Sequence, residues 1–422
     1  MSASSHTGLS LAPFRALRPA VDDERLGRLL CPPYDVIDPA MRDRLLAGDP
    51  DNAVAVILPE QTDAGYAQAV DQLESWVRDG VYARDDAAAM FVYEMADGAQ
   101  VTRGLLGAVE LRAAEDGVIL PHENTMAGPV ADRLRVMTET DADLEPIYLV
   151  YDGGGAASQV VRGVSNRAPI ATARTPDGIV HRLWTLHDRA EVDAIAADLE
   201  TRRALIADGH HRYATYRERQ RIRRESAGAG PWDRGLALLV DSSDYGPQVH
   251  PIHRVIAGLS LVDALDRLDG LATVEPTSSN PEQALTQLGD ERAAGPFAAV
   301  LTDGARTAVI VDKDGALAAK AIRPDDPPEL ASLDVSVLHR GVVEGAWQLT
   351  DDVHTVDYAH DVATAVQRAV QRDGVAVLLR ATPVSAVAAV AAVGARMPRK
   401  STLFTPKPAS GLVMRRLGDQ TD

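Results

Sequence analysis

Cysteine is nearly absent from this 422-residue chain, which contains Cys31 alone. A single cysteine excludes an intramolecular disulfide, and such usage is typical of proteins in a reducing compartment. No run of apolar residues approaches the roughly 18 that a membrane-spanning helix requires. The first residues, Met1–Leu11, lack the basic segment and apolar stretch of a secretory signal. We therefore expect a cytoplasmic protein without a membrane partner.

Basic residues are scarce relative to acidic ones. The chain has 43 lysines and arginines against 61 aspartates and glutamates, which gives a formal net charge of −18. This excess of negative charge disfavours broad contact with a nucleic-acid backbone. The densest basic run, Arg217–Arg224, is interrupted by Glu218 and is typical of a solvated helix face. We expect small-molecule partners and no nucleic acid, and the sequence leaves the oligomeric state open.

The overall composition and the length of the chain are those of a globular protein with more than one domain. The chain is 45% hydrophobic and 25% charged, and 422 residues exceed what one hydrophobic core usually organises. Short helical and extended patterns alternate along it, which predicts an α/β or α+β fold with mixed sheets and flanking helices. Strands are expected over 53–58, 147–151, 204–206 and 236–241.

Three units are expected along the chain. The first, 1–152, contains the turn-forming segment Cys31–Asp35, and a glycine triplet then begins the central unit, 153–256. The third unit is 257–422. The first two units could instead form one domain.

The most informative segment is Asp208–Ala214, where a short apolar stretch gives way to a long charged helix. Glycine permits a tight turn at this junction. The first N–H groups of a helix have no partner within it, and the helix dipole adds positive potential there. We therefore expect a phosphate site, bound by Gly209, His210, His211 and Arg212, with Asp208 and His210 as candidate catalytic residues. In the alternative, the two histidines only cap the helix and pack against neighbours.

A second candidate segment begins at His122 and Glu123, with Asp132 and Arg133 about one loop later. A carboxylate beside a bound hydroxyl group can act as a general base, so Glu123 is a candidate catalytic residue. In the alternative, Glu123 caps the following helix or pairs with Arg133.

Lysines near the end of the chain form a third candidate. Lys400 and Lys407 flank Ser401 in a Ser/Thr- and Pro-rich loop after the last expected helix. Lysine side chains can reach a phosphate as mobile point charges, so these three residues are expected to bind phosphate. A solvated tail is the alternative.

Histidines could also form a metal site. His253, followed by Arg254, could join His210 and His211, because neutral imidazoles suit zinc or iron. The spacings do not match a standard zinc motif. No metal ligand is therefore assigned with certainty.

Taken together, these motifs resemble a bacterial and archaeal family that is catalogued as a domain of unknown function, DUF1015. The resemblance covers nearly the whole chain and rests on Cys31–Asp35, His122–Glu123, Thr125, Asp132–Arg133, Asp208–Ala214, His253–Arg254 and Lys400–Thr402. The residues that support the expected site are Tyr34, Asp35, His122, Asp132, Arg133, His253 and Arg254. The family label supplies no activity.

More remotely, Asp208–Ala214 is similar to the nucleotide-binding signature of the ParB and sulfiredoxin superfamily. In the free-serine kinases of that superfamily, an Asp-Gly-His-His-Arg turn binds nucleotide phosphates. This resemblance implies a ParB/sulfiredoxin-like core and assigns phosphate contacts to Gly209, His210, His211 and Arg212. His210 stands where sulfiredoxin has its reactive cysteine, which disfavours a sulfinic-acid reductase.

The leading functional expectation is a small-molecule kinase. It would transfer a phosphoryl group between ATP or ADP, with Mg²⁺, and a hydroxyl metabolite such as serine. Glu123 or Asp208 would accept the hydroxyl proton, and Lys400 or Lys407 would close over the phosphate.

Two other functions are kept open. One is a metal-dependent hydrolase or phosphatase, built from His122, Glu123, His210, His211 and His253. The other is a nucleotide or metabolite sensor without catalytic activity.

Overall fold

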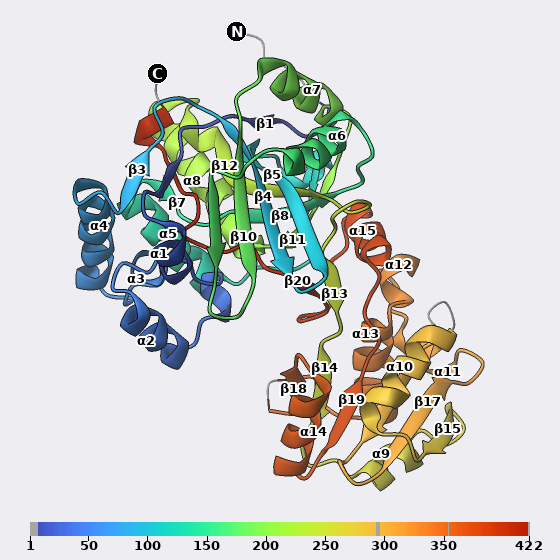
Figure 1. Cartoon of the computed structure of the whole chain (residues 1–422). Helices are drawn as coiled ribbons and strands as arrows, with labels where there is room; N and C mark the ends of the chain where they lie inside the picture. Colours follow the sequence, from blue (N-terminus) through green and yellow to red (C-terminus); the bar gives the residue numbers. More distant parts are fainter. Residues whose placement is uncertain (1–6, 293–295, 353, 421–422) are drawn as a thin grey trace. The chain divides into compact units, whose positions relative to one another are not determined.

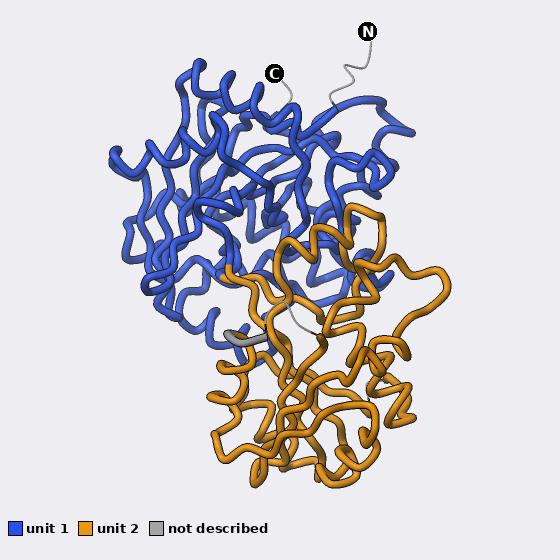
Figure 2. Tube along the Cα trace, turned by 90° about the vertical axis from the view of Figure 1, so that its right-hand side faces the viewer, with its two compact units in different colours: residues 1–121, 125–247, 406–422 blue, residues 122–124, 248–405 orange. Residues whose placement is uncertain are grey.

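The computed structural model describes residues 7–292, 296–352 and 354–420, and the chain forms two compact units. Unit 1 comprises Met1–Pro121, Thr125–Pro247 and Pro406–Asp422, and unit 2 comprises His122–Asn124 and Gln248–Thr405 (Figure 2). The chain therefore leaves unit 1, builds unit 2, and returns to unit 1 with its last segment.

Unit 1 is built on a mixed nine-stranded sheet, and this confirms the expected α/β class. The strand order is β6-β11-β8-β12-β5-β4-β10-β9, and β1 also pairs with β5. Figure 1 labels most of these strands. The pairs β11–β6 and β12–β8 are parallel and the other pairs are antiparallel. The strands are β1 (Leu11–Ala12), β4 (Met90–Asp97), β5 (Gln100–Glu110), β6 (Ile119–Leu120), β8 (Ile147–Tyr151), β9 (Ala171–Arg174), β10 (Val180–Leu186), β11 (Ala204–Asp208) and β12 (Arg234–Asp241).

This strand order explains why the expected N-terminal and central units share one body. Strands from before and after residue 152 are interleaved in the sheet, since β8 lies between β11 and β12, and the neighbours β5 and β4 lie between β12 and β10. The expected boundary at 152/153 therefore falls inside unit 1. The expected boundary at 256/257 falls inside unit 2, at the end of β14 (His253–Ile256).

The longer helices of unit 1 flank this sheet and its extensions. They are α1 (Asp23–Leu29), α2 (Pro39–Gly48), α4 (Asp63–Arg78), α5 (Ala127–Glu139), α6 (Ala156–Gly163), α7 (Arg189–Leu199) and α8 (His210–Ala227). Helix α4 buries Ala69, Leu73 and Trp76 on one face, at the three- and four-residue spacing of a packed helix. Residues 53–58, expected as a strand, instead contain the short helix α3 (Val54–Ile57).

Unit 2 contains a six-stranded antiparallel sheet in the order β15-β17-β16-β19-β14-β18. Besides β14, this sheet contains β15 (Ala272–Thr277), β16 (Ala298–Thr302), β17 (Thr307–Asp312), β18 (Val356–Ala359) and β19 (Val375–Leu378). The longer helices of unit 2 are α10 (Pro281–Arg292), the π-helix η5 (Val337–Ala346), α14 (Val362–Gln371) and α15 (Val384–Ala392). None of the helices in the described ranges combines the length and apolar character needed to cross a membrane.

Candidate functional site

The segment Asp208–Ala214 forms the strand, turn and helix that its sequence predicts. Strand β11 ends at the buried Asp208. Its pairing register with β8 shifts between Ile206 and Asp208. Gly209 follows with φ 91° and ψ 31°, in the left-handed region that favours glycine, and α8 begins at His210. A Cβ atom at Gly209 would also lie 3.1 Å from Nε of Arg212. No side chain caps the first turn of α8.

The carboxylate of Asp208 is held between two cations. The Arg212 guanidinium donates to one oxygen of Asp208 and also to the carbonyl of Pro146, and the Lys407 ammonium contacts the other oxygen of Asp208. Burial alone would raise the pKa of Asp208, but the charges of Lys407 and Arg212 outweigh it and lower that pKa. Burial alone would lower the pKa of the Lys407 ammonium, but the negative charges of Asp208 and Asp35 outweigh it and raise that pKa. All three side chains are therefore charged at neutral pH.

Arg212 is not positioned as an open ligand for a phosphate, although the sequence suggested that role. Its side chain is only 1% exposed, and two of its nitrogens are used by Asp208 and Pro146. Its Nε is buried without a hydrogen-bond partner. The geometry therefore makes Arg212 a residue that positions Asp208.

A similar arrangement recurs at Asp143, which lies before β8 and is fully buried. Asp143 accepts from Arg219 of α8 through one oxygen and from Arg415 at 2.9 Å through the other. The second oxygen also accepts the backbone N–H of Leu236 at 3.1 Å. One carboxylate thus joins α8 to the C-terminal segment.

Glu145, two residues after Asp143, also connects α8 to the C-terminal segment. Its side chain accepts from Ser410 Oγ at 2.9 Å, and its backbone carbonyl accepts from Tyr216 Oη at 2.9 Å. Residues 212, 216 and 219 lie on one face of α8 because they are three and four positions apart. The segment 407–415 and this face of α8 therefore contact the same three acidic residues, Asp143, Glu145 and Asp208.

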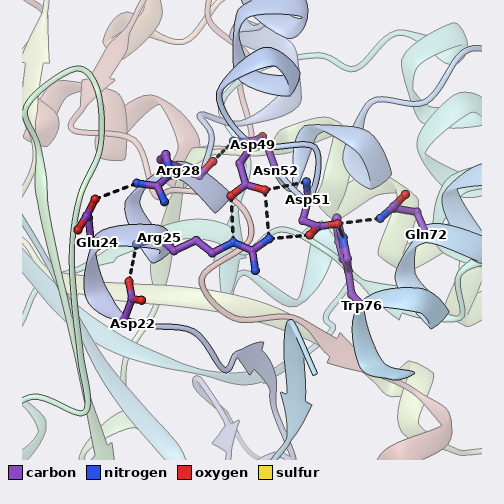
Figure 3. A network of polar contacts seen from close by, with 9 residues as sticks. All are labelled: Asp22, Glu24, Arg25, Arg28, Asp49, Asp51, Asn52, Gln72 and Trp76. Carbon is purple, nitrogen blue, oxygen red and sulfur yellow. Dashed lines mark hydrogen bonds and ion pairs between the residues drawn. The ribbon is translucent and has the colours of Figure 1, made fainter. Parts of the chain in front are cut away.

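A polar network fixes the chain just before the Cys31–Asp35 turn (Figure 3). The side-chain amide of Asn52, which is fully buried, donates to the carbonyls of Arg28 at 2.7 Å and Leu30 at 2.9 Å. Arg25 donates to Asp49 at 3.0 Å and to Asp51 at 2.7 Å (Figure 3). These bonds attach the segment that precedes the turn to the part of unit 1 that leads into α3 and α4.

The turn itself is attached to the C-terminal segment and to Glu145. Cys31 and Ser410 exchange backbone hydrogen bonds, at 3.3 Å and 2.8 Å. The backbone N–H of Tyr34 donates to Glu145 at 3.0 Å. Asp35 is exposed, and its charge acts on both Arg212 and Lys407. The turn thus places one accessible carboxylate beside the cationic pair.

Arg133 and Asp132, which the sequence analysis grouped with His122 and Glu123, pack against this turn. The Arg133 guanidinium lies over the Tyr34 ring, 4.2 Å from its centroid, and donates to Asp132 at 2.7 Å. Asp132 also accepts from Tyr66 Oη at 2.6 Å. A cation over an aromatic face in a buried setting stabilises the packing of both side chains.

Lys407 also lines a cavity of about 460 Å³ within unit 1. This volume lies in the range of small-molecule sites, about 300–1,000 Å³. The walls are largely apolar and carry the basic side chains of Arg28, Arg44 and Lys407 and the acidic side chain of Asp177. The other lining residues are Leu30, Cys31, Pro32, Met41, Leu45, Gly48, Thr175, Pro176, Ile179, His181 and Ala409.

A directed chain of hydrogen bonds forms one wall of this cavity. Tyr93 Oη accepts from the backbone N–H of Ala409 at 3.1 Å, so its own proton is free to be donated to Nδ1 of His181 at 2.8 Å. The neutral ring of His181 then carries its proton on Nε2, which contacts Thr175 Oγ1 at 3.1 Å. Thr175 donates to Asp177 at 2.5 Å. Sequence reasoning missed His181, because no motif surrounds it.

The buried His181 predicts a pH-dependent stability. Burial lowers its pKa to about 4, against about 6.5 in the unfolded chain. As the pH falls from 6.5 to 4, the unfolded chain binds a proton that the folded protein does not, so the free energy of unfolding falls by up to about 3 kcal/mol. Urea unfolding of the wild type and His181→Gln across this range tests the effect. The variant should show the shallower slope, and equal slopes would contradict the assignment.

The two histidines of α8 remain close to the turn. His210 is buried, and His211 accepts the backbone N–H of Met126 at 3.1 Å through Nε2. This bond requires an unprotonated Nε2 in the His211 ring. Both residues therefore occupy the first turn of α8 as expected, and at least one of them orders the start of α5.

Other residues suggested by the sequence belong to unit 2. His122 is buried, and its Nε2 lies 3.1 Å from Thr402 Oγ1. Ser401 donates to the carbonyl of Pro398 at 2.5 Å. Glu123 adjoins His122 and is partly exposed. Ser401 is therefore engaged in a turn of its own segment.

The pair His253–Arg254 is also built into unit 2. Nδ1 of His253 accepts the backbone N–H of Leu379 at 3.3 Å, and burial lowers the pKa of His253 to about 4. Arg254 donates to His339 Nε2 at 3.0 Å and to the carbonyl of Lys400 at 3.0 Å. The two lysines expected to act together thus belong to different units, Lys400 to unit 2 and Lys407 to unit 1.

Among the described residues, no three His, Cys, Asp or Glu side chains are grouped so that they could hold a metal ion. The histidines proposed for a shared metal site are divided between the units, with His210 and His211 in unit 1 and His122 and His253 in unit 2. The geometry within each unit therefore gives the metal-dependent hydrolase no ligand set.

Comparison with solved structures finds several proteins that align with 72% of this chain. A conserved hypothetical protein from Pyrococcus furiosus is 16% identical, with a TM-score of 0.33 and 94% of its length covered. A free serine kinase in complex with AMP is 15% identical, with a TM-score of 0.34 and 90% covered. SbnI with a C-terminal truncation, from Staphylococcus aureus, is 11% identical, with a TM-score of 0.36 and 85% covered. Scores this low carry no functional conclusion for this chain.

No curated protein matches this chain. A family model described as "Protein of unknown function (DUF1015)" matches residues 11–336, which is most of the sequence. This match confirms the resemblance drawn from the Cys31–Asp35 and Asp208–Ala214 motifs. The chain belongs to the DUF1015 family.

Proposed function

We propose that unit 1 binds a nucleotide and transfers a phosphoryl group between it and a small hydroxyl metabolite such as serine. The observation that carries this proposal is the ionic group Lys407–Asp208–Arg212. It lies at the junction of β11 and α8, and its lysine lines the cavity of about 460 Å³. A fixed ammonium group beside an uncapped helix start is a suitable environment for phosphate oxygens.

Each residue of the turn has a role in this proposal. Backbone N–H groups of the first turn of α8, with His210 and His211, contact the phosphate. Lys407 neutralises the charge that develops on it, and Asp208 and Arg212 hold Lys407 in place. Mg²⁺ accompanies ATP or ADP and is bound chiefly through phosphate oxygens, which needs few protein carboxylates.

The proton acceptor in this proposal is Asp35. A general base works best when its pKa lies near the working pH, and the lowered pKa of Asp208 makes it a weak base. Glu145 is buried and accepts hydrogen bonds from Ser410 and Tyr34. Asp35 is the exposed carboxylate of this cluster, so it is the one that a substrate hydroxyl can reach. Glu123 of unit 2 remains a second candidate.

The binding step is tested by calorimetric titration of ADP and ATP with Mg²⁺ into the wild type and Lys407→Met. The variant keeps an unbranched stem of nearly the same length but removes the charged ammonium group. It is expected to weaken nucleotide affinity about tenfold or more, because a charge-assisted contact to phosphate is lost. Lys313→Met, an exposed lysine of unit 2, is the matched control and should bind as the wild type does.

Product analysis with a panel of hydroxy amino acids then tests the reaction. Phosphorylated serine or a relative would support the kinase. Nucleotide binding without any product would favour the sensor. Absence of nucleotide binding in the wild type would overturn the proposal.

A further inference from the structure

A second cavity of unit 1 lies apart from the ionic group at Asp208. It has a volume of about 560 Å³, again within the range of small-molecule sites. Its lining contains three arginines, Arg15, Arg234 and Arg415, and one acidic residue, Asp419. The other lining residues are Ala12, Pro13, Phe14, Ala88, Ala108, Gly230, Pro231 and Gln420.

Arg234, at the start of β12, has no carboxylate partner in direct contact. Its guanidinium donates to the carbonyl of Ala108 at 3.1 Å, to the hydroxyl of Ser10 at 3.1 Å and to the carbonyl of Ser10 at 3.4 Å. These acceptors are all neutral. Burial and the neighbouring charge of Arg415 lower the pKa of Arg234, and they outweigh the opposing charges of Glu110 and Asp233. Glu110 and Asp233 therefore act on this guanidinium through space, without contacting it.

Arg415, another arginine of this lining, is held by acceptors of the protein itself. Its Nη1 donates to Asp143 at 2.9 Å and its Nη2 to the carbonyl of Pro231 at 2.7 Å. Its Nε is buried and has no hydrogen-bond partner, although the whole side chain is only 3% exposed. An unfilled buried donor on a charged group is costly unless a ligand or water satisfies it.

The carboxylates near these arginines have other arginine partners, since Glu110 lies 3.6 Å from Arg112 and Asp233 contacts Arg224. Asp143 already serves two arginines, Arg219 and Arg415, and Asp419 lies 3.4 Å from Arg84. Arg234 is thus an additional cation within a protein of net charge −18. Cationic donors gathered on one cavity in an acidic protein indicate a site for an anion.

We infer that this cavity binds a small oxyanion that carries two or more negative charges, at a site distinct from the proposed phosphoryl-transfer site. Guanidinium groups match the oxygen spacing of phosphate and of carboxylate through paired N–H donors. Arg234, which is bonded to neutral acceptors only, provides such donors, and Arg15 and Arg415 add positive charge to the lining. The ligand would be a phosphate group or a multivalent carboxylate.

The test uses inorganic phosphate and citrate as probes, with sodium chloride at matched ionic strength. Thermal unfolding and calorimetry are compared for the wild type, Arg234→Gln and Arg234→Lys, with circular dichroism as the check on folding. The same titrations in the Lys407→Met background separate this site from the one at Asp208. Arg189→Gln, whose parent side chain is 93% exposed, is the matched control.

Saturable binding of either probe is expected in the wild type, in Lys407→Met and in Arg189→Gln. Arg234→Gln is expected to weaken it about tenfold or more, and Arg234→Lys less, because lysine keeps the charge but loses the paired donors. A response to phosphate alone identifies a phosphate ligand, and a response to citrate alone identifies a carboxylate ligand. No saturable binding of either probe, or equal binding in Arg234→Gln, would overturn the inference.

Discussion

Replacing Asp143 by alanine is expected to lower the free energy of unfolding by about 3–5 kcal/mol, or to prevent folding. Asp143 is fully buried and is the carboxylate partner of both Arg219 and Arg415, whose side chains are almost as deeply buried. The substitution leaves two guanidinium groups in the interior without their anion. Removal of one member of a buried ionic group costs far more than the pair contributes, because the remaining charge stays desolvated.

Urea unfolding, followed by the fluorescence of the buried tryptophans, measures this loss. Glu225→Ala is the control, because Glu225 pairs with Arg221 of the same helix on the surface. That pair should contribute at most about 1 kcal/mol. If Asp143→Ala and Glu225→Ala were equally stable, the two arginines would have to be neutralised by something other than Asp143.

The second large effect is expected for Asp35→Asn in the proposed phosphoryl transfer. Loss of a general base reduces the rate about 100-fold to 10,000-fold. Nucleotide affinity should change much less, because Lys407 and the first turn of α8 are left intact. The check is the rate of product formation under saturating nucleotide, with Asp43→Asn, an exposed aspartate of α2, as the control.

The comparison with Glu123→Gln decides which carboxylate accepts the proton. If Asp35→Asn kept the wild-type rate while Glu123→Gln lost it, the acceptor would be Glu123 of unit 2. If both variants kept the rate, neither residue would act as the base. A loss confined to Asp35→Asn agrees with its place beside Lys407 and Arg212.

Local patterns predicted the strand, turn and helix around Gly209, because each element there follows from its own residues. An apolar run forms β11, glycine adopts the left-handed turn, and a long charged segment forms α8. The same kind of reasoning gave the wrong element for residues 53–58. A short apolar run has no period that separates a buried strand from a buried helix. Here the side chain of Asn52 accepts the N–H of Val54 at 2.9 Å and starts the helix α3.

The composition of the ionic groups could not be predicted from the sequence. Asp208 and Lys407 are 199 positions apart, and Asp143 and Arg415 are 272 apart. No local pattern relates such residues, and only the return of the chain to unit 1 brings them together. For the same reason the sequence could not separate Lys400 from Lys407, or show that Arg212 is used by Asp208.

The return of the C-terminal segment to unit 1 has a consequence during synthesis on the ribosome. Translation delivers Asp143, Glu145 and Asp208 long before Lys407, Ser410 and Arg415, which bind to them. All of Gln248–Thr405 emerges in between. Unit 1 therefore completes its ionic interior only after the residues of unit 2 have been made, and a nascent chain that stops short of Lys407 lacks these three partners.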